Sequence, residues 1–184
     1  MDSTIEKTKE RMSKSIVSLN SDFAAIRTGR ASSAMFDKIK VEYYGQQSPL
    51  SQVATISIPE ARLVVIQPWD KALLGEIEKA IQKSELSLNP ANDGKIIRIS
   101  IPPLTEERRK EFVKLAKSTA EQSRVAIRNI RRDANDSFKK MEKNHELSED
   151  EVKHGMEKIQ KLTDKYIEEV NSILAKKEKE IMEV

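Results

Sequence analysis

Apolar side chains recur at helical spacing from the start of the chain. Five follow one another at intervals of four, three, four and three residues, the spacing of a helix face that packs in a bundle: Met12, Ile16, Leu19, Phe23 and Ile26. Ser3 and Glu6 have the spacing of a capping box, and Gly29 suits the position that follows a helix end. The pattern predicts a helix from about residue 3 to residue 28.

From residue 31 the pattern changes to that of short strands. Ile39, Val41 and Tyr43 alternate with charged residues, as in a half-buried strand, and Tyr44-Gly45 predicts a turn. Further elements are predicted as strands at 53–58, 63–67 and 97–101, a helix at 71–84 that begins at Asp70, and turns at Asn89-Pro90 and Asp93-Gly94. Residues 31–104 are therefore expected to form a small β/α unit.

Helical periodicity returns at Thr105, a suitable N-cap with Glu106 and Glu107 in the first turn. No proline or glycine interrupts this helix until beyond residue 140, so it can extend for roughly 55–60 Å. Ser148 and Glu151 repeat the capping-box spacing and open a third helix. Its apolar seam consists of Met156, Ile159, Leu162, Tyr166, Val170, Ile173 and Leu174.

These elements predict an α+β protein in which a β/α unit is inserted into a three-helix bundle. Residues 1–30 and 105–184 would form the bundle, and residues 31–104 the insertion. The chain crosses between the two parts twice, and two linkers that lie close together in space make a natural hinge. The hinge residues are predicted to be Arg30, Ala31, Ser32, Ser33, Pro102, Pro103 and Leu104.

Composition narrows the function classes. The 184 residues include 34% charged and 4% aromatic side chains, which suits long helices. The chain has no cysteine, so disulfides, thiolate metal sites and cysteine nucleophiles are excluded. No signal-peptide or transit-peptide pattern and no membrane-length apolar run is present. We expect a soluble cytoplasmic protein. The missing transit peptide favours a bacterial one, and a processed organellar protein is the alternative.

The basic surplus of the chain is concentrated in residues 105–147, where lysine and arginine exceed the acids by four. Between Glu121 and Asp133 the only charged residues are four arginines, which fall within an arc of about 100° on one helix face: Arg124, Arg128, Arg131 and Arg132. Arginine binds phosphate bidentately and stacks on bases, so this arginine face indicates RNA or DNA. The alternative is a solvated face with pairs such as Arg132 with Asp136.

The other candidate residues give weaker indications of function. Arg27 and Arg30 flank a predicted helix end, where complementing the helix dipole is as reasonable as a functional role. The remaining candidates are expected to be surface histidines and packing aromatics: His145, His154, Tyr43, Tyr44 and Trp69. No nucleophile, base and oxyanion donor come together, and no metal or cofactor motif is present. The sequence does not predict an enzyme.

Five motifs, in order and at the expected separations, make the chain resemble the ribosome recycling factor family over essentially its full length. They are Arg27-Thr-Gly-Arg-Ala-Ser32, Val41-Glu-Tyr-Tyr-Gly45, Leu88-Asn-Pro90, Pro102-Pro-Leu-Thr-Glu-Glu-Arg-Arg109 and Arg124-Val-Ala-Ile-Arg-Asn-Ile-Arg-Arg-Asp-Ala-Asn-Asp136. One departure is that the family's usual proline after Arg-Ala-Ser is Ser33 here, which puts the stiffness of this linker in question because proline would fix φ.

The resemblance implies an L-shaped monomer that acts with elongation factor G and GTP to split post-termination ribosomes into subunits. The bundle would bind ribosomal RNA of the large subunit, and elongation factor G would push the smaller domain. The family's RNA-contacting arginines match Arg128, Arg131 and Arg132, and Arg27 and Arg30 match its motif near the hinge. The resemblance implies no cofactor, no membrane and no duplex DNA as partners.

Two other classes remain possible from the residues alone. A structural coiled-coil adaptor would explain the long helices but not an arginine face without acids. A DNA-binding regulator would explain the arginines, but such proteins usually dimerise to read paired half-sites. Sedimentation with ribosomes, and competition by duplex DNA, would separate these classes.

Overall fold

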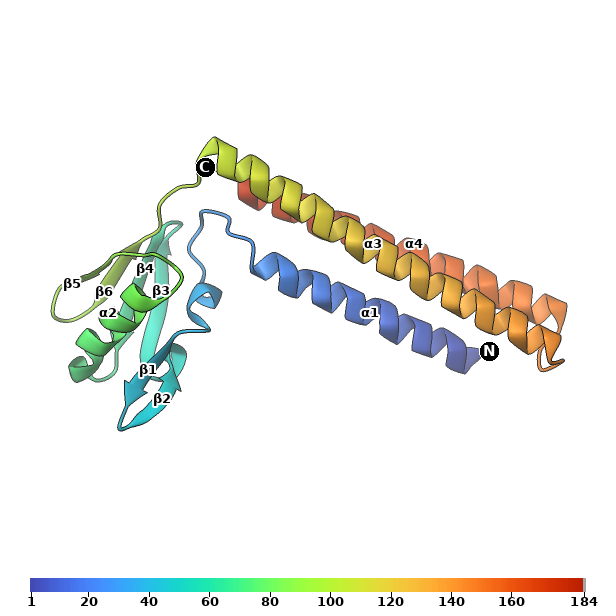
Figure 1. The fold of residues 1–184 in the computed structure, drawn as a ribbon, viewed down its shortest axis with the longest axis horizontal. Helices are drawn as coiled ribbons and strands as arrows, with labels where there is room; N and C mark the ends of the chain where they lie inside the picture. The colour runs from blue at the N-terminus through green and yellow to red at the C-terminus, as the bar shows by residue number, and fades with distance from the viewer. Residues whose placement is uncertain (184) are drawn as a thin grey trace. The chain divides into compact units, whose positions relative to one another are not determined.

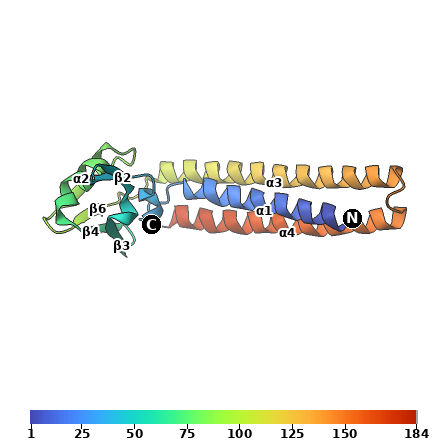
Figure 2. The ribbon, with the colours of Figure 1, turned by 90° about the horizontal axis from the view of Figure 1, so that it is seen from below.

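The computed structural model describes residues 1–183, and these form two compact units. One unit contains Met1–Arg27 and Glu106–Glu183, and the other contains Thr28–Thr105. The first is a bundle of three helices, α1 (Asp2–Ala24), α3 (Glu106–Lys143) and α4 (Glu149–Met182), which lie side by side in Figures 1 and 2. The predicted α+β class, with a three-helix bundle and an inserted small β unit, is confirmed.

The core of the bundle is built from the predicted apolar seams. All five seam residues of the first helix are buried, as are four of the five apolar residues beside the arginine face: Ile127, Ile130, Ala134 and Phe138. On α4 the buried seam residues are Ile159, Tyr166 and Val170, and the remaining four are half-buried. Within residues 1–183 no helix is long and apolar enough to span a membrane.

The helix ends show which capping predictions hold. Ser148 accepts a hydrogen bond from the Glu151 N–H while the Glu151 carboxylate accepts from the Ser148 N–H, so the capping box that begins α4 is confirmed. The capping box predicted at Ser3 and Glu6 is wrong, because α1 already begins at Asp2 with Met1 as its N-cap. The prediction that α1 reaches residue 28 is also wrong.

Helix α1 ends at Ala24, and Ala25 caps it in a right-handed conformation. The apolar seam continues past this end, because Ile26 remains buried without being helical. The spacing of apolar residues therefore predicted burial correctly at Ile26 but not helical structure, and Gly29 does not cap α1. Gly29 has φ +73° and lies against Leu104, since a Cβ there would stand 3.4 Å from Leu104 Cγ.

The smaller unit contains two antiparallel sheets. A hairpin pairs β1 (Lys40–Tyr43) with β2 (Gln46–Pro49), and the second sheet has the order β3-β4-β6-β5. Its strands are β3 (Ala54–Glu60), β4 (Leu63–Pro68), β5 (Pro90–Asn92) and β6 (Ile97–Ser100). The four predicted strands are present, whereas β2 and β5 were not predicted. The turn predicted at Asn89-Pro90 is wrong because Pro90 opens β5, an edge strand where a missing N–H is tolerated.

Helix α2 (Leu74–Lys83) lies in this unit (Figure 1). Its residues Leu74, Ile77 and Ile81 are buried in the core of the unit. Asp70 accepts a hydrogen bond from the Ala72 N–H at 3.0 Å and caps a short 3-10 helix, Lys71–Leu73, that leads into α2. The predicted helix start is therefore correct, although its first turn is 3-10. Two further 3-10 helices are Ser33–Phe36 and Leu50–Gln52.

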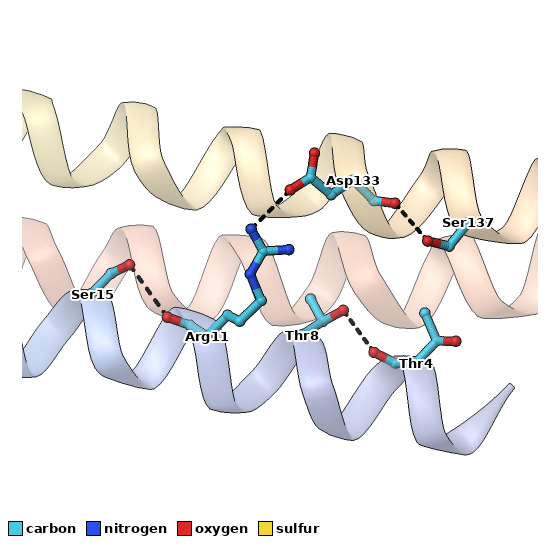
Figure 3. Close-up of polar contacts among 6 residues, drawn as sticks. All are labelled: Thr4, Thr8, Arg11, Ser15, Asp133 and Ser137. Carbon is cyan, nitrogen blue, oxygen red and sulfur yellow. Dashed lines mark hydrogen bonds and ion pairs between the residues drawn. The ribbon is translucent and has the colours of Figure 1, made fainter.

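A polar contact joins α1 to α3 at the surface of the bundle. Arg11 Nη2 lies 2.8 Å from Asp133 Oδ2, and both side chains are more than half exposed (Figure 3). On the same face of α1, the buried Thr8 donates to the Thr4 carbonyl at 2.7 Å. A surface ion pair contributes little stability, so the contact matters mainly because it occupies the acid that follows Arg132.

Candidate nucleic-acid interface

Helix α3 gives the arginines a rigid platform. Its apolar face is held in the bundle core by Ile127, Ile130 and Ala134, and the arginines lie on the adjoining face because their spacing repeats with the helix turn. They are not equally available, however. Their hydrogen bonds and exposure divide them into arginines tied to α4, an arginine paired with an acid, and one that is open.

Arg124 and Arg131 are tied to α4. Arg124 Nε donates to Asn171 Oδ1 at 2.9 Å, and its side chain is only 19% exposed. Arg131 Nη1 donates to Gln160 Oε1 at 3.2 Å, and its Nε is buried without a hydrogen-bond partner in the part of the chain that the structure describes. Both guanidinium groups therefore help to join α3 to α4, and neither projects fully from the surface.

Glu121 connects Arg124 to Arg128. Its Oε2 lies 2.9 Å from Arg124 Nη1, and its Oε1 lies 3.2 Å from Arg128 Nη1. The hydrogen bonds from Arg124 and then Arg128 lower the pKa of this carboxyl group, so it is ionised at neutral pH. Sequence reasoning placed Glu121 outside the arginine face, as its boundary, and missed it as part of the site. Its spacing of three and seven residues before the two arginines was the available signal.

Arg132 is the open member of the set. Its side chain is exposed, and within residues 1–183 no hydrogen bond or ion pair engages it. The alternative pairing with Asp136 is not formed in the described residues, and Asp133 is instead bound to Arg11. Arg132 thus presents an uncompensated guanidinium group next to an acid that another helix neutralises.

Arg27 and Arg30 are exposed and lie beyond the end of α1. The last turn of α1 itself contains no basic residue, so neither arginine belongs to it. Arg27 belongs to the bundle unit and Arg30 to the smaller unit. Their role at the RNA stays a prediction.

Within the smaller unit, both linkers are bonded to the same turn. The Ala31 N–H donates to the Ala61 carbonyl at 2.7 Å, and the Ile101 N–H donates to the adjacent Arg62 carbonyl at 2.8 Å. Pro102, Pro103 and Leu104 follow Ile101 without helix or strand structure. The Ala61-Arg62 turn therefore marks the point from which each linker leaves the unit.

Ser33 lies inside a 3-10 helix rather than in a free linker. Ser32 caps this helix by accepting from the Ala34 N–H at 3.3 Å, and Ser33 is its first residue. The first helical position is one that proline commonly occupies, and Ser32, at φ −142° and ψ 138°, has the conformation that precedes a proline. The family's proline would therefore fit at Ser33, the first position of this 3-10 helix.

The other candidates have mostly the expected environments. His145 and His154 are exposed, and no cluster of metal-ligating side chains occurs in the described residues. Tyr43 is half-buried against the core of the smaller unit, as expected. Packing is the wrong interpretation for Tyr44 and Trp69, which are 85% and 70% exposed. Tyr44, at φ 48°, forms the hairpin turn with Gly45, and its exposed ring meets the Tyr43 ring edge-on with the centroids 4.4 Å apart.

Comparisons with known proteins match the chain to one family. A model of the family described as "Ribosome recycling factor" matches residues 19–182. The chain is 61% identical to the ribosome-recycling factor of Treponema denticola, covering 95% of each chain, and 57% identical to that of Bacillus licheniformis, covering 98% of this chain and 97% of the relative.

Two solved structures are also similar. A solution structure of the ribosome recycling factor aligns with a TM-score of 0.79 at 46% identity, covering 100% of this chain and 97% of that one. The second is a model of the T. thermophilus factor which, with E. coli elongation factor G, is bound to the E. coli post-termination complex. It aligns with a TM-score of 0.66 at 48% identity, covering 99% and 98% of the two chains.

Proposed function

The chain belongs to the ribosome recycling factor family, and we propose that it works with elongation factor G and GTP to split post-termination ribosomes into subunits. Elongation factor G enters this proposal because the similar T. thermophilus factor is described with it on a post-termination complex. The chain itself is a translation factor of a non-enzymatic family, so the GTPase partner supplies the work.

The arginine face of α3 is proposed to bind folded ribosomal RNA of the large subunit. The observation that supports this most is the exposed Arg132, which has no partner within residues 1–183. A guanidinium group left open on a rigid helix can bind a phosphate bidentately without first breaking an internal contact. The neighbouring Asp133 does not repel that phosphate strongly, since Arg11 neutralises it.

The other arginines are assigned graded roles. Arg128 is 41% exposed and can turn to RNA once its contact with Glu121 opens. Arg124 and Arg131 contribute positive potential while they stay bonded to α4. Arg27 of the bundle unit and Arg30 of the smaller unit are also proposed to contact RNA. We therefore propose that Arg124, Arg128, Arg131 and Arg132 form one RNA-binding surface to which they contribute unequally.

The linkers are proposed to act as a hinge that lets elongation factor G move the smaller unit while the bundle stays on the RNA. The hydrogen bonds of Ala31 and Ile101 to the Ala61-Arg62 turn support a pivot at that turn. Backbone without helix or strand hydrogen bonds, at Arg30 and from Pro102 to Leu104, can absorb the φ and ψ changes of a rotation.

Arg132→Ala tests the RNA assignment directly. Losing one charge-assisted bidentate contact should weaken binding to purified large subunits by about ten- to hundredfold. It should also reduce the slope of log K against log salt by about 0.7 to 0.9. Subunit splitting with elongation factor G and GTP should fall in parallel, while the circular dichroism and melting temperature of the variant stay unchanged.

Arg98→Ala is the matched control, because Arg98 is an equally charged, exposed arginine on β6 of the smaller unit. It should leave large-subunit affinity within about twofold. If Arg132→Ala binds as tightly as the wild type at matched salt, RNA anchoring through this face is refuted. If binding weakens but splitting is unaffected, the link from anchoring to recycling is refuted.

A further inference from the structure

Glu121 of α3 lies between two guanidinium groups of the arginine face, as a bound phosphate would. Each carboxylate oxygen of Glu121 faces a different guanidinium group, Oε2 at 2.9 Å from Arg124 and Oε1 at 3.2 Å from Arg128. We propose that Glu121 competes with RNA phosphate for Arg128, and so limits how tightly the bundle binds the ribosome. This inference rests on the proposed RNA-binding function of the face.

The competition concerns Arg128 rather than Arg124. Arg124 is held from two sides, by Glu121 and by Asn171 of α4, and its side chain is 19% exposed. Arg128 is 41% exposed, and Glu121 is its one hydrogen-bond or ion-pair partner within residues 1–183. Opening the Glu121–Arg128 pair therefore frees a guanidinium group that nothing else restrains.

The pair is weak enough to be exchanged. Glu121 is 54% exposed, and solvated ion pairs of this kind change an equilibrium by about fivefold at most. A phosphate diester offers Arg128 the same charge and more acceptor oxygens, so RNA can take the place of the carboxylate. The displaced carboxylate then remains close to RNA phosphates and repels them.

Both effects lower affinity, and both end when the charge of Glu121 is removed. In Glu121→Gln, Arg128 is released before RNA arrives and the repulsion is gone. We expect binding to purified large subunits to become about two- to tenfold tighter, chiefly through slower dissociation. The slope of log K against log salt should become steeper by up to about one, because one more phosphate is neutralised without compensation.

Asp136→Asn is the matched control. Asp136 is an exposed acid on the same helix, four residues from Arg132, and it forms no hydrogen bond or ion pair in the described part of the chain. Both substitutions remove one negative charge and preserve shape. If Glu121 acted only through the general potential of the helix, the two variants would gain affinity equally, and our proposal would be overturned.

A double-mutant cycle with Arg128→Ala tests whether Glu121 acts through Arg128. The gain from Glu121→Gln should fall to less than about twofold when Arg128 is absent, since the substitution then removes only the repulsion between the carboxylate and RNA phosphates. A full gain in the Arg128→Ala background, or unchanged or weaker binding by Glu121→Gln, would overturn the proposal. The Arg132→Ala measurement does not involve Glu121, so failure of the RNA-binding function is distinguishable from failure of the competition.

Discussion

Gly155 offers a sharp test of how tightly α3 and α4 pack. A methyl group added at this position of α4 would lie 2.9 Å from Phe138 Cζ and 3.1 Å from Phe138 Cε1. Phe138 is fully buried and packs in a cluster with Ala134, Val152 and Ile159. Its ring therefore cannot move away without disturbing these neighbours, and Gly155→Ala should force the two helices apart.

Two opposing effects set the size of the change. Replacing glycine by alanine within a helix contributes about 0.8–1.0 kcal/mol of stability. Inserting a methyl group into a packed core costs about 1–3 kcal/mol. The net expectation is a loss of about 1 kcal/mol, which corresponds to a fall of roughly 4 °C in the melting temperature of a unit of this size.

Gly75 of α2 is the matched control. It is exposed, and no atom lies within 4 Å of a Cβ added there. Gly75→Ala should therefore stabilise the smaller unit. Replacing glycine by alanine within a helix contributes about 1 kcal/mol, and this value is an upper bound here because Gly75 lies in the first turn of α2. The two substitutions are chemically the same and should have opposite signs.

Urea and thermal unfolding can follow both units. Far-ultraviolet circular dichroism reports chiefly on the bundle, whereas the fluorescence of Trp69, the only tryptophan, reports on the smaller unit. In a Phe138→Leu background the clash should be relieved, and Gly155→Ala should become neutral or stabilising. If Gly155→Ala raises the stability of the wild-type bundle, or destabilises both backgrounds equally, the packing argument is refuted.

Two further predictions concern local caps. Ser33→Pro should stabilise the smaller unit by about 0.4–1 kcal/mol, because the first position of the 3-10 helix and the extended backbone of Ser32 both suit proline. A lower urea midpoint for Trp69 fluorescence would contradict this. Ser148→Ala should cost the bundle about 1 kcal/mol through loss of the cap. Hydrogen bonds from the Ser148 N–H and hydroxyl lower the pKa of the Glu151 carboxyl group in the folded protein. Glu151 therefore stabilises the fold above its unfolded pKa of about 4.3, and this stabilisation is lost as the pH falls through the lower folded pKa. The stability difference between wild type and Glu151→Gln should accordingly shrink between pH 7 and pH 3 in circular dichroism melts, and a constant difference would contradict the assignment.

The sequence predicted structure most accurately where a pattern repeats along a helix or where a few neighbouring residues form a cap or a turn. The seams of the three long helices predicted the bundle core, since a packed helix must place apolar residues every three or four positions. Ser148 with Glu151 and the Tyr44-Gly45 turn were also correct, because each depends on a few neighbouring residues.

Features that the residues' own apolar pattern does not indicate were missed. The residues of β2, Gln46–Pro49, carry no strand pattern, and their strand exists because β1 pairs with them. The predicted end of α1 was too late because Ile26 is buried without being helical. Exposure of Tyr44 and Trp69 was likewise missed, since aromatic residues at strand ends usually pack.

By itself the sequence determined the class of the fold, the family and the helix that carries the arginine face. Helical periodicity and short motifs depend on residues that are close together in the sequence, so they can be recognised without the structure. Only the tertiary structure decided how far each arginine is available. Asn171 and Gln160 of α4 hold Arg124 and Arg131, Arg11 of α1 occupies Asp133, and Arg132 is left open. The availability of a charge depends on the groups that surround it in space, and α1 and α4 bring most of those groups from distant parts of the chain.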